Sequence, residues 1–469
     1  MKRLPENVNK NLFKGDQLKV FNGTLKFFRK TGGGFLLVKG KAGTGKTHIV
    51  QRIIEQLLFQ SYGRVCMLAP TGQAVKICRD SADYYNTNLS YATLHSAFGL
   101  IPKKDGDKVI FVKNSFASVL ADRVDVLFID EVSQLEDRLF FLLMDKVEDG
   151  MKVILIGDEH QVPPINHNNS IPFTKDGLED FDIEVITMEK PIRQEGENHP
   201  ILDEALYASK SQKTRRWYDI SNDSENDGKS VNFLAQKSED DIYDILYENF
   251  KTSEFETDVN FMKVLAWRNK TVNAWNIVIR RMLYKKKFKD YGKIVMGEKL
   301  LSGRPLMVDD GQGRQVMLFS TNEELDVVDY EIKEYLADKD TGLIIKYYET
   351  LVSFIDFTGT KKQVAINIVH EDSDEKFNDT LEILSENADS YPKGSYHYLT
   401  AWNTYWKFKE IFMPIHYNYC KTVHKSQGST FTNCMVMLWD IQENNKVYER
   451  NRLIYTGISR ASTKLFVIH

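Results

Sequence analysis

The sequence predicts an α/β fold built on parallel sheets. Two observations support this prediction: short runs rich in Val, Ile, Leu and Phe recur along the 469-residue chain, and segments of helical periodicity separate them. Such runs are typical of strands buried on both faces of a parallel sheet. The first half of the chain contains five of them, and residues suited to binding or catalysis follow each one: Gly34–Val38, Val65–Leu68, Val126–Ile129, Val153–Ile156 and Val185–Met188.

A second series of apolar runs predicts a second α/β unit. We expect its strands at Val264–Ala266, Phe412–Tyr417, Met435–Leu438 and Leu465–Ile468. Two segments interrupt the α/β pattern. Ile101–Val112, with Asp105-Gly106 at its centre, has the pattern of a β-hairpin. The segment from about Asn322 to Ser395 alternates between apolar and polar residues and is rich in turns, which predicts an inserted module of antiparallel strands.

The composition predicts a globular protein, and we expect it in the cytoplasm, or in the host cytosol if a virus encodes it. Hydrophobic residues make up 42% and charged residues 27% of the chain, and no apolar run approaches the ~20 residues that a membrane span needs. The four cysteines contain no CxxC pair and predict neither a disulfide framework nor a zinc site. The N-terminus does not resemble a secretory signal.

Charge is unevenly distributed along the chain, although the net charge is only −4. Lys and Arg greatly outnumber acids in Lys263–Lys299, and acids outnumber Lys in Asp219–Asp258. Each block is consistent with a solvated face. The basic block is equally consistent with a surface that binds phosphate groups.

A phosphate-binding loop is the clearest motif. The segment GKAGTGKT satisfies the pattern GxxxxGK[ST] and lies between a predicted strand and the predicted helix His48–Phe59, the context that the motif requires. Backbone N–H groups of such a loop surround phosphate oxygens, the lysine reaches the β- and γ-phosphates, and the hydroxyl ligates Mg²⁺. The candidate nucleotide-binding residues are Gly40, Gly43, Thr44, Gly45, Lys46 and Thr47.

Two later segments supply candidate hydrolytic residues. Asp130 and Glu131 end the run Val126–Ile129, where a carboxylate that holds Mg²⁺ and one that polarises the attacking water belong. Gln161, in GDEHQVPP, could sense the γ-phosphate or order that water. The alternative is a loop glutamine with no functional role, which would give the same sequence pattern. Together with the loop, the two acids predict nucleotide hydrolysis.

Two arginines are candidates for stabilising the charge that develops on the transferred phosphoryl group. Arg193 follows the first α/β unit, in PIRQ, and Arg460 lies in the second, in YTGISRA. An arginine supplied by a separate domain would couple the state of the nucleotide to domain closure. Either residue alone could instead be a surface arginine in an ion pair.

These segments, in their order and spacing, resemble the motifs of superfamily-one helicases of the Dda/RecD-like group. The segments are GKAGTGKT, LAPTGQAVK, FIDEVSQ, IGDEHQVPP, KPIRQ, TVHKSQGSTF and YTGISRA. The resemblance implies two RecA-like P-loop motor domains with parallel sheets, a β-hairpin inserted in the first and a small β-barrel inserted in the second. We place the first motor domain at residues 1–200 with its hairpin at about 96–120, the second at 201–320 and 406–469, and the barrel at 321–405.

The resemblance also implies roles outside the phosphate loop. Gln17 matches the glutamine that reads adenine. The residues that match DNA-contacting positions are Thr71, Thr93, His95, Thr422, His424 and Gln427. Phe111, near the hairpin, is our candidate for the wedge that separates strands, and an ordinary core phenylalanine is the alternative. Relatives often carry His at the position of Gly72 and Glu at the position of Thr430.

We therefore expect an ATP- and Mg²⁺-dependent DNA helicase that moves along single-stranded DNA, with 5′→3′ movement implied by the resemblance. Expected partners are single-stranded DNA and duplex junctions, with a single-strand-binding or replication protein as a further candidate, and the protein would act as a monomer. Three alternatives remain: a translocase that does not separate duplexes, an RNA helicase, and a nucleotide-gated DNA-binding module without turnover. A nuclease would need a second acidic cluster, which we do not find.

Overall fold

A computed structural model describes residues 3–13, 15–113, 119–164, 167–189, 199–214, 218–220, 222–226, 228–236, 238–284, 292–309, 311, 315–338, 342–356 and 360–469. Contacts divide the chain into two compact units. Unit 1 comprises Met1–Ile101, Lys113–Ile279 and Tyr419–His469, and unit 2 comprises Pro102–Val112 and Arg280–Asn418. No helix in the described ranges has both the length and the apolar character needed to cross a membrane.

The first sheet of unit 1 has six parallel strands in the order β3-β2-β6-β7-β1-β8. All five predicted apolar runs are strands of this sheet, which confirms the expected parallel arrangement. The strands are β1 (Gly34–Gly40), β2 (Val65–Ala69), β3 (Leu89–Thr93), β6 (Val126–Ile129), β7 (Lys152–Gly157) and β8 (Glu184–Met188). Its main helices are α1 (Gln17–Phe28), α2 (Lys46–Phe59), α3 (Gly72–Ser81), α5 (Asp137–Glu148) and α6 (Lys175–Asp180).

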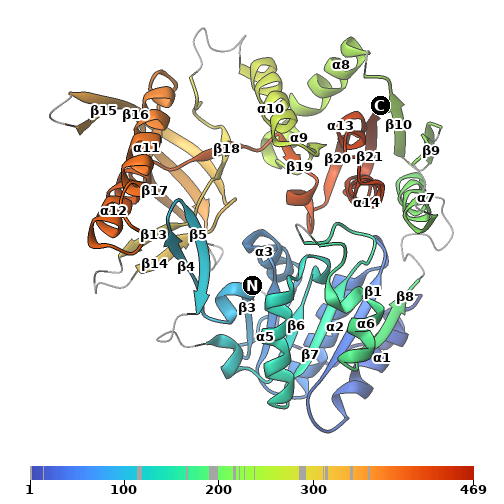
Figure 1. The fold of residues 1–469 in the computed structure, drawn as a ribbon. Helices are drawn as coiled ribbons and strands as arrows, with labels where there is room; N and C mark the ends of the chain where they lie inside the picture. Colours follow the sequence, from blue (N-terminus) through green and yellow to red (C-terminus); the bar gives the residue numbers. More distant parts are fainter. Residues whose placement is uncertain are drawn as a thin grey trace. The chain divides into compact units, whose positions relative to one another are not determined.

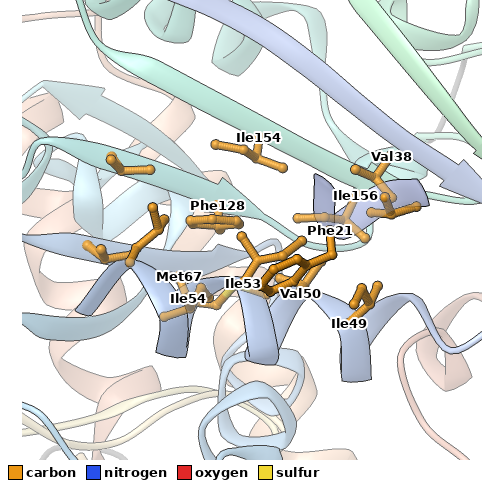
Figure 2. Close-up of a cluster of buried hydrophobic side chains, with 14 of the residues drawn as sticks. Phe21, Val38, Ile49, Val50, Ile53, Ile54, Met67, Phe128, Ile154 and Ile156 are labelled. Atoms are coloured by element: carbon orange, nitrogen blue, oxygen red, sulfur yellow. The ribbon is translucent and has the colours of Figure 1, made fainter. Parts of the chain in front are cut away.

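Both faces of this sheet are buried, as its apolar strands require. On one face, Ile49 and Ile53 of α2 point toward the sheet, where they pack with Phe128 and Ile154 of its central strands (Figure 2). On the other face, α5 packs through Phe140 and its neighbours. Each such side chain contributes about 1.5–3 kcal/mol when fully buried. This packing fixes the carboxyl ends of β1, β6 and β7, from which the candidate site residues extend.

The second sheet of unit 1 has the order β19-β11-β20-β21-β10-β9 and is parallel except for the β9–β10 pair. Its strands are β9 (Ser224–Asn226), β10 (Lys229–Leu234), β11 (Met262–Ala266), β19 (Cys420–Thr422), β20 (Phe431–Met437) and β21 (Ala461–Ile468). Among its helices are α7 (Pro200–Thr214), α8 (Glu239–Phe250), α9 (Ser253–Thr257), α10 (Asn269–Tyr284), α13 (Leu438–Gln442) and α14 (Val447–Ile458).

One strand of the second series was predicted in the wrong sheet. We expected Phe412–Tyr417 among the parallel strands, but β18 (Ile415–Tyr417) pairs antiparallel with β12 (Lys299–Ser302) in unit 2. The parallel strand is instead the short β19, beside β11. Its sequence, Cys-Lys-Thr, has no apolar run that would have predicted it, although all three residues are buried.

Unit 2 contains an antiparallel sheet with the order β17-β16-β15-β12-β18. Its long strands are β15 (Glu324–Asp338), β16 (Leu343–Ile355) and β17 (Lys361–Val369). A smaller pair is formed by β13 (Leu306–Asp309) and β14 (Gln315–Phe319). Helices α11 (Asp374–Asp389) and α12 (Tyr396–Ile411) pack side by side (Figure 1).

The inserted module differs in two ways from the expected barrel at residues 321–405. The strands β12 and β18 lie outside those bounds, and the compact unit runs from Arg280 to Asn418. Within the described residues the sheet is open, since β17 and β18 are its two edges. The long alternating strands were visible in the sequence. Of the short flanking strands, β12 was not predicted and β18 was assigned to the other sheet.

Candidate active site

A cavity of about 570 Å³ in unit 1 is lined by loops of both parallel sheets. The first sheet and its helices contribute Gln17, Lys46, Thr47, Asp130, Glu131 and Gln161. The loops of the second sheet contribute Gly428, Thr430, Ser459 and Arg460. A Cβ atom built on Gly428 would lie 3.7 Å from Oε1 of Glu131, which shows how closely the two sets of loops approach. The structure therefore brings Lys46 and Arg460 to one cavity.

The phosphate loop has the backbone that its glycines permit. Gly43 and Gly45 have φ of +79° and +78°, in the left-handed region that glycine adopts without a steric penalty. A Cβ atom on Gly43 would also lie 2.9 Å from Cδ1 of Leu202. Gly45 caps α2, so the loop leads directly into the N-terminus of a 14-residue helix. Free N–H groups and the helix dipole make this position suited to an anion.

The ammonium group of Lys46 is held at the loop. Its Nζ donates hydrogen bonds to the carbonyl oxygens of Gly40 at 2.6 Å and Lys41 at 3.0 Å. The loop is braced by Thr44, whose buried hydroxyl donates to the carbonyl of Lys41 at 2.9 Å. A phosphate group in the cavity would offer Lys46 an anionic acceptor in place of two neutral carbonyls, so that the attraction of opposite charges would add to the hydrogen bonds.

Asp130 follows β6, and its carboxylate accepts hydrogen bonds from the backbone of Glu131 at 2.9 Å and from the thiol of Cys78 at 3.5 Å. The Thr47 hydroxyl also bonds to it. Burial raises the pKa of Asp130, and these bonds and the charge of Lys46 oppose that rise. Asp130 and Thr47 thus place a carboxylate and a hydroxyl together beneath the phosphate loop.

Glu131 occupies an unusual position in both backbone and charge. Its φ of +53° is in the left-handed region, which costs a non-glycine residue of order 1–3 kcal/mol and recurs at functional sites. Burial, followed by repulsion from Asp130, raises the pKa of Glu131 to about 7, although Arg460 and Lys46 act in the opposite direction. Among the described residues, neither Oε2 of Glu131 nor Oε1 of Gln161 has a hydrogen-bond partner. Both are acceptors suited to a water molecule.

Arg460 reaches the cavity from the end of α14. Its guanidinium group donates to the carbonyls of Thr456 at 3.0 Å and Ser429 at 3.2 Å and to the Ser459 hydroxyl at 2.9 Å. These bonds fix a buried charge whose field reaches Glu131. Arg193, the other candidate arginine, lies outside the described residues, and so does the rest of KPIRQ.

Gln17, at the start of α1, also lines the cavity. It is buried, and its Nε2 is 3.2 Å from Nδ1 of His48. His48 and Leu12 also line the cavity, and neither was predicted. The position of His48, directly after the phosphate loop, was the available signal. Thr430, noted for its departure from relatives, lines the same cavity.

The first group of candidate DNA-contacting residues follows adjacent strands of the first sheet. Thr71 follows β2 and caps the N-terminus of α3. Thr93 ends β3 and caps the N-terminus of α4 (Leu94–Ala97). Their hydroxyl oxygens accept the N–H groups of Ala74 at 3.2 Å and Ser96 at 3.3 Å. His95, in α4, is half-buried, and this burial lowers its pKa, so its ring is neutral at pH 7.

The second group follows β19. The Thr422 hydroxyl accepts the N–H of Lys425 at 3.2 Å, and burial lowers the pKa of His424. Gln427 does not extend freely from its loop. Its Nε2 donates to the carbonyl of Val162 at 3.0 Å, next to Gln161, so it links the loops of the two parallel sheets.

The hairpin in unit 2 carries Phe111. Strands β4 (Leu100–Asp105) and β5 (Lys108–Lys113) form this hairpin, and the side chain of Phe111 is 39% exposed. That exposure disfavours the alternative of a core phenylalanine. The hairpin tip is attached to α12: Nε1 of Trp406 donates to the carbonyl of Gly106 at 3.0 Å, and Lys104 pairs with Glu410 at 2.8 Å.

The fold and this cavity define a class: a P-loop protein with two parallel sheets that both contribute to one nucleotide site. Comparison with known proteins refines the class. Residues 28–167 match the family model "AAA domain", and residues 417–468 match "UvrD-like helicase C-terminal domain". The two matched segments carry the phosphate loop and Arg460, respectively.

Relatives that match most of the chain include a phage helicase and a bacterial RecBCD subunit. The ATP-dependent DNA helicase dda of Enterobacteria phage T4 is 23% identical over 92% of this chain and 93% of its own. The RecBCD enzyme subunit RecD of Buchnera aphidicola is 22% identical over 92% of this chain and 69% of its own. A solved Pif1 helicase, reported with DNA unwinding at forked duplexes, shares the fold, with a TM-score of 0.51 and 16% identity over 97% of this chain and 92% of its own.

These matches confirm the resemblance that the motifs predicted. Over most of its length the chain is similar to relatives named Dda and RecD, and it shares its fold with a solved Pif1 helicase.

Proposed function

We propose that the protein is an ATP-dependent DNA helicase that translocates along single-stranded DNA in the 5′→3′ direction and separates duplex DNA. The observation that carries the proposal is the convergence of Lys46, Glu131 and Arg460 on one cavity lined by both parallel sheets. Hydrolysis at such a site can change how the sheets pack, and that change can become movement. The T4 relative is named an ATP-dependent DNA helicase, which supports the assignment.

The described side chains can perform hydrolysis as follows. Lys46 holds the β- and γ-phosphates of ATP, and Gln161 and Glu131 orient a water molecule through their unpartnered oxygens. The water oxygen attacks the γ-phosphorus, the bond to the β-phosphate oxygen breaks, and Glu131 accepts the proton released by the water. Arg460 stabilises the charge on the transferred group. We assign the analogous role of a second phosphate contact to Arg193.

The residues present fit Mg²⁺ as the accompanying ion. Asp130 and Thr47 offer hard oxygen ligands beside the phosphate loop, and Mg²⁺ is usually held by one or two carboxylates together with substrate phosphates. In the described part of the chain no group of three or more His, Cys, Asp or Glu side chains could hold a metal alone. When bound with ATP, Mg²⁺ would neutralise charge on the β- and γ-phosphates.

The adenine end of the cavity suits Gln17, whose amide offers both a donor and an acceptor. For DNA, the hydroxyls of Thr71, Thr93 and Thr422 lie at strand ends, where they can bond the phosphodiester backbone without reading sequence. We assign His95, His424 and Gln427 to the same surface. We also propose that the protein acts as a monomer. A single-strand-binding or replication protein would be a further partner.

The pH dependence of ATP hydrolysis tests the role of Glu131. The carboxylate must be ionised to accept a proton, and its pKa is raised to about 7. We therefore expect kcat/KM, which reports the free enzyme, to be full above that pH and to fall roughly tenfold per pH unit below it. An acid limb near pH 4.5, the ordinary range of a glutamate, would contradict the assignment of Glu131 as the base.

Replacement of Phe111 with alanine tests strand separation apart from ATP hydrolysis. Stacking of an aromatic side chain on a base is worth about 1–3 kcal/mol, so we expect Phe111→Ala to slow unwinding roughly tenfold or more while DNA-stimulated ATP hydrolysis changes less than twofold. Ile110→Ala, an exposed apolar change on the same strand, is the matched control. Equal loss of both activities in Phe111→Ala, or of neither, would exclude the wedge.

The experiment that tests the function as a whole pairs two assays. ATP hydrolysis is measured with and without single-stranded DNA, and strand displacement is measured on a partial duplex. Stimulated hydrolysis with displacement supports a helicase. Stimulated hydrolysis without displacement would indicate a translocase, and stimulation by RNA alone would move the assignment to an RNA helicase.

A further inference from the structure

Tyr455, on α14 beside the second sheet, reaches the phosphate loop of the first. Its side chain is 1% exposed. The phenol oxygen accepts a hydrogen bond from the backbone N–H of Ala42 at 2.9 Å, and the hydroxyl donates to Oδ2 of Asp158 at 2.5 Å. Ala42 is the third residue of the loop, and Asp158 directly follows β7. Both partners of this one hydroxyl therefore belong to the first sheet, although α14 belongs to the second.

The carboxylate that receives the Tyr455 hydroxyl is itself held in a buried network. Asp158 is 1% exposed, and its Oδ1 accepts the N–H of His160 at 3.0 Å. Nδ1 of His160 is 3.0 Å from Oε1 of Gln212, and Nε2 of Gln212 donates to the carbonyls of His160 at 3.0 Å and Asn451 at 3.3 Å. The network thus returns to α14 through α7, so the tyrosine is fixed from both ends.

The contact of Tyr455 with Ala42 and Asp158 depends on hydrogen bonds of its hydroxyl and not only on packing of its ring. Burial and the neighbouring Asp158 raise the pKa of Tyr455 well above its ordinary value, so the hydroxyl keeps its proton. It can donate to Asp158 and accept from Ala42 at the same time, which a phenylalanine could not. Loss of the hydroxyl would leave a buried carboxylate oxygen and a buried N–H group without this partner, and buried polar groups are costly when unpaired.

Helix α14 contains Tyr455 and ends just before Arg460. Tyr455 lies in the last turns of α14, and Arg460 follows the end of that helix, where its guanidinium group bonds to the carbonyl of Thr456. Because Thr456 is the neighbour of Tyr455, a bond that fixes Tyr455 against the phosphate loop also fixes the support of Arg460. The loop and the arginine are therefore connected through one turn of helix.

We propose that Tyr455 is a positioning residue that fastens α14 to the phosphate loop at Ala42 and thereby places Arg460 against the γ-phosphate. This inference rests on the proposed ATP hydrolysis. In this arrangement the hydrogen bonds of Tyr455 to Ala42 and Asp158 form when the loops of the two sheets meet. Through these bonds, a change in the phosphate loop on nucleotide binding or hydrolysis would shift α14. Tyr455 itself does not contact the nucleotide.

The test is a double-mutant cycle on the full chain. Tyr455→Phe is expected to lower kcat of DNA-stimulated ATP hydrolysis by about tenfold with KM for ATP changed less than twofold, a smaller loss than the ~10²–10³ typical of removing a group that stabilises the transition state directly. In an Arg460→Ala background, single-turnover hydrolysis should show no further loss from Tyr455→Phe, because the tyrosine acts through the arginine.

Tyr84→Phe is the matched control. Tyr84 is also buried, and its hydroxyl donates to the carbonyl of Gln51 at 2.8 Å, away from the cavity. Its removal should lower Tm by an amount comparable to Tyr455→Phe and leave kcat unchanged. Equal fold losses from Tyr455→Phe in the wild-type and Arg460→Ala backgrounds would overturn the inference alone. Absence of ATP hydrolysis in the wild-type protein would overturn the proposed function and the inference with it.

Discussion

Replacing Arg460 with alanine is expected to lower DNA-stimulated ATP hydrolysis by about 10³–10⁵-fold, the range typical of an arginine finger. The physical reason is that charge develops on the transferred phosphoryl group, and Arg460 is the described arginine that lines the cavity. Its guanidinium group is already oriented by three hydrogen bonds, so the free energy of reorganisation is small when charge develops on the phosphoryl group. ATP should still bind, because Lys46 and the phosphate loop remain.

The measurement for Arg460→Ala is single-turnover hydrolysis beside the affinity for a fluorescent ATP analogue. Arg29→Ala is a suitable control, since Arg29 is exposed at the end of α1 and does not line the cavity. A loss in affinity equal to the loss in rate would mean that Arg460 binds the ground state as strongly as the transition state. A loss of less than tenfold would remove Arg460 from the hydrolytic site.

Replacing Lys46 with alanine should abolish turnover while single-stranded DNA binding stays within about twofold of the wild type. The lysine ammonium is the charge at the phosphate loop, and removal of a preorganised donor alone typically costs about 10²–10³ in kcat. DNA binding is assigned to other loops, those around Thr71, Thr93 and Thr422. Hydrolysis rates and fluorescence anisotropy of a labelled oligonucleotide measure the two effects separately.

Full ATP hydrolysis by Lys46→Ala would contradict the assignment of the phosphate loop. Loss of DNA binding in the same variant, with its Tm unchanged, would instead mean that the loop and the DNA surface are not separable as assigned here.

The parallel sheets, the phosphate loop and the acids that follow β6 could be predicted from the sequence because their sequence signals are local. A strand buried on both faces must be apolar throughout, and a phosphate loop needs its glycines and lysine at fixed spacing. Strands without a continuous apolar run were missed, among them β3 (Leu89–Thr93) and β19, which lie at sheet edges. In unit 2, the short strand β12 was missed, and β18 was predicted as a strand but in the wrong sheet, because its pairing with β12 leaves no local signal.

The residues that were missed at the site are those defined by contacts between distant segments. Tyr455 meets Ala42 across 413 positions of sequence and Asp158 across 297. A tyrosine inside a helix is most simply a core residue, and no local pattern shows that the hydroxyl of Tyr455 is bonded to the phosphate loop. For Phe111, in contrast, the sequence posed the right alternatives, and the exposure of its side chain on the hairpin favours one of them.

We propose that ATP hydrolysis drives this chain along a DNA strand. The most direct measurement is displacement from two otherwise identical partial duplexes, one with a 5′ single-stranded overhang and one with a 3′ overhang, each with and without ATP. We expect separation of the 5′-overhang duplex only, in the presence of ATP only, and none by Lys46→Ala. Both duplexes remaining intact in ATP, or both separating without it, would contradict the account.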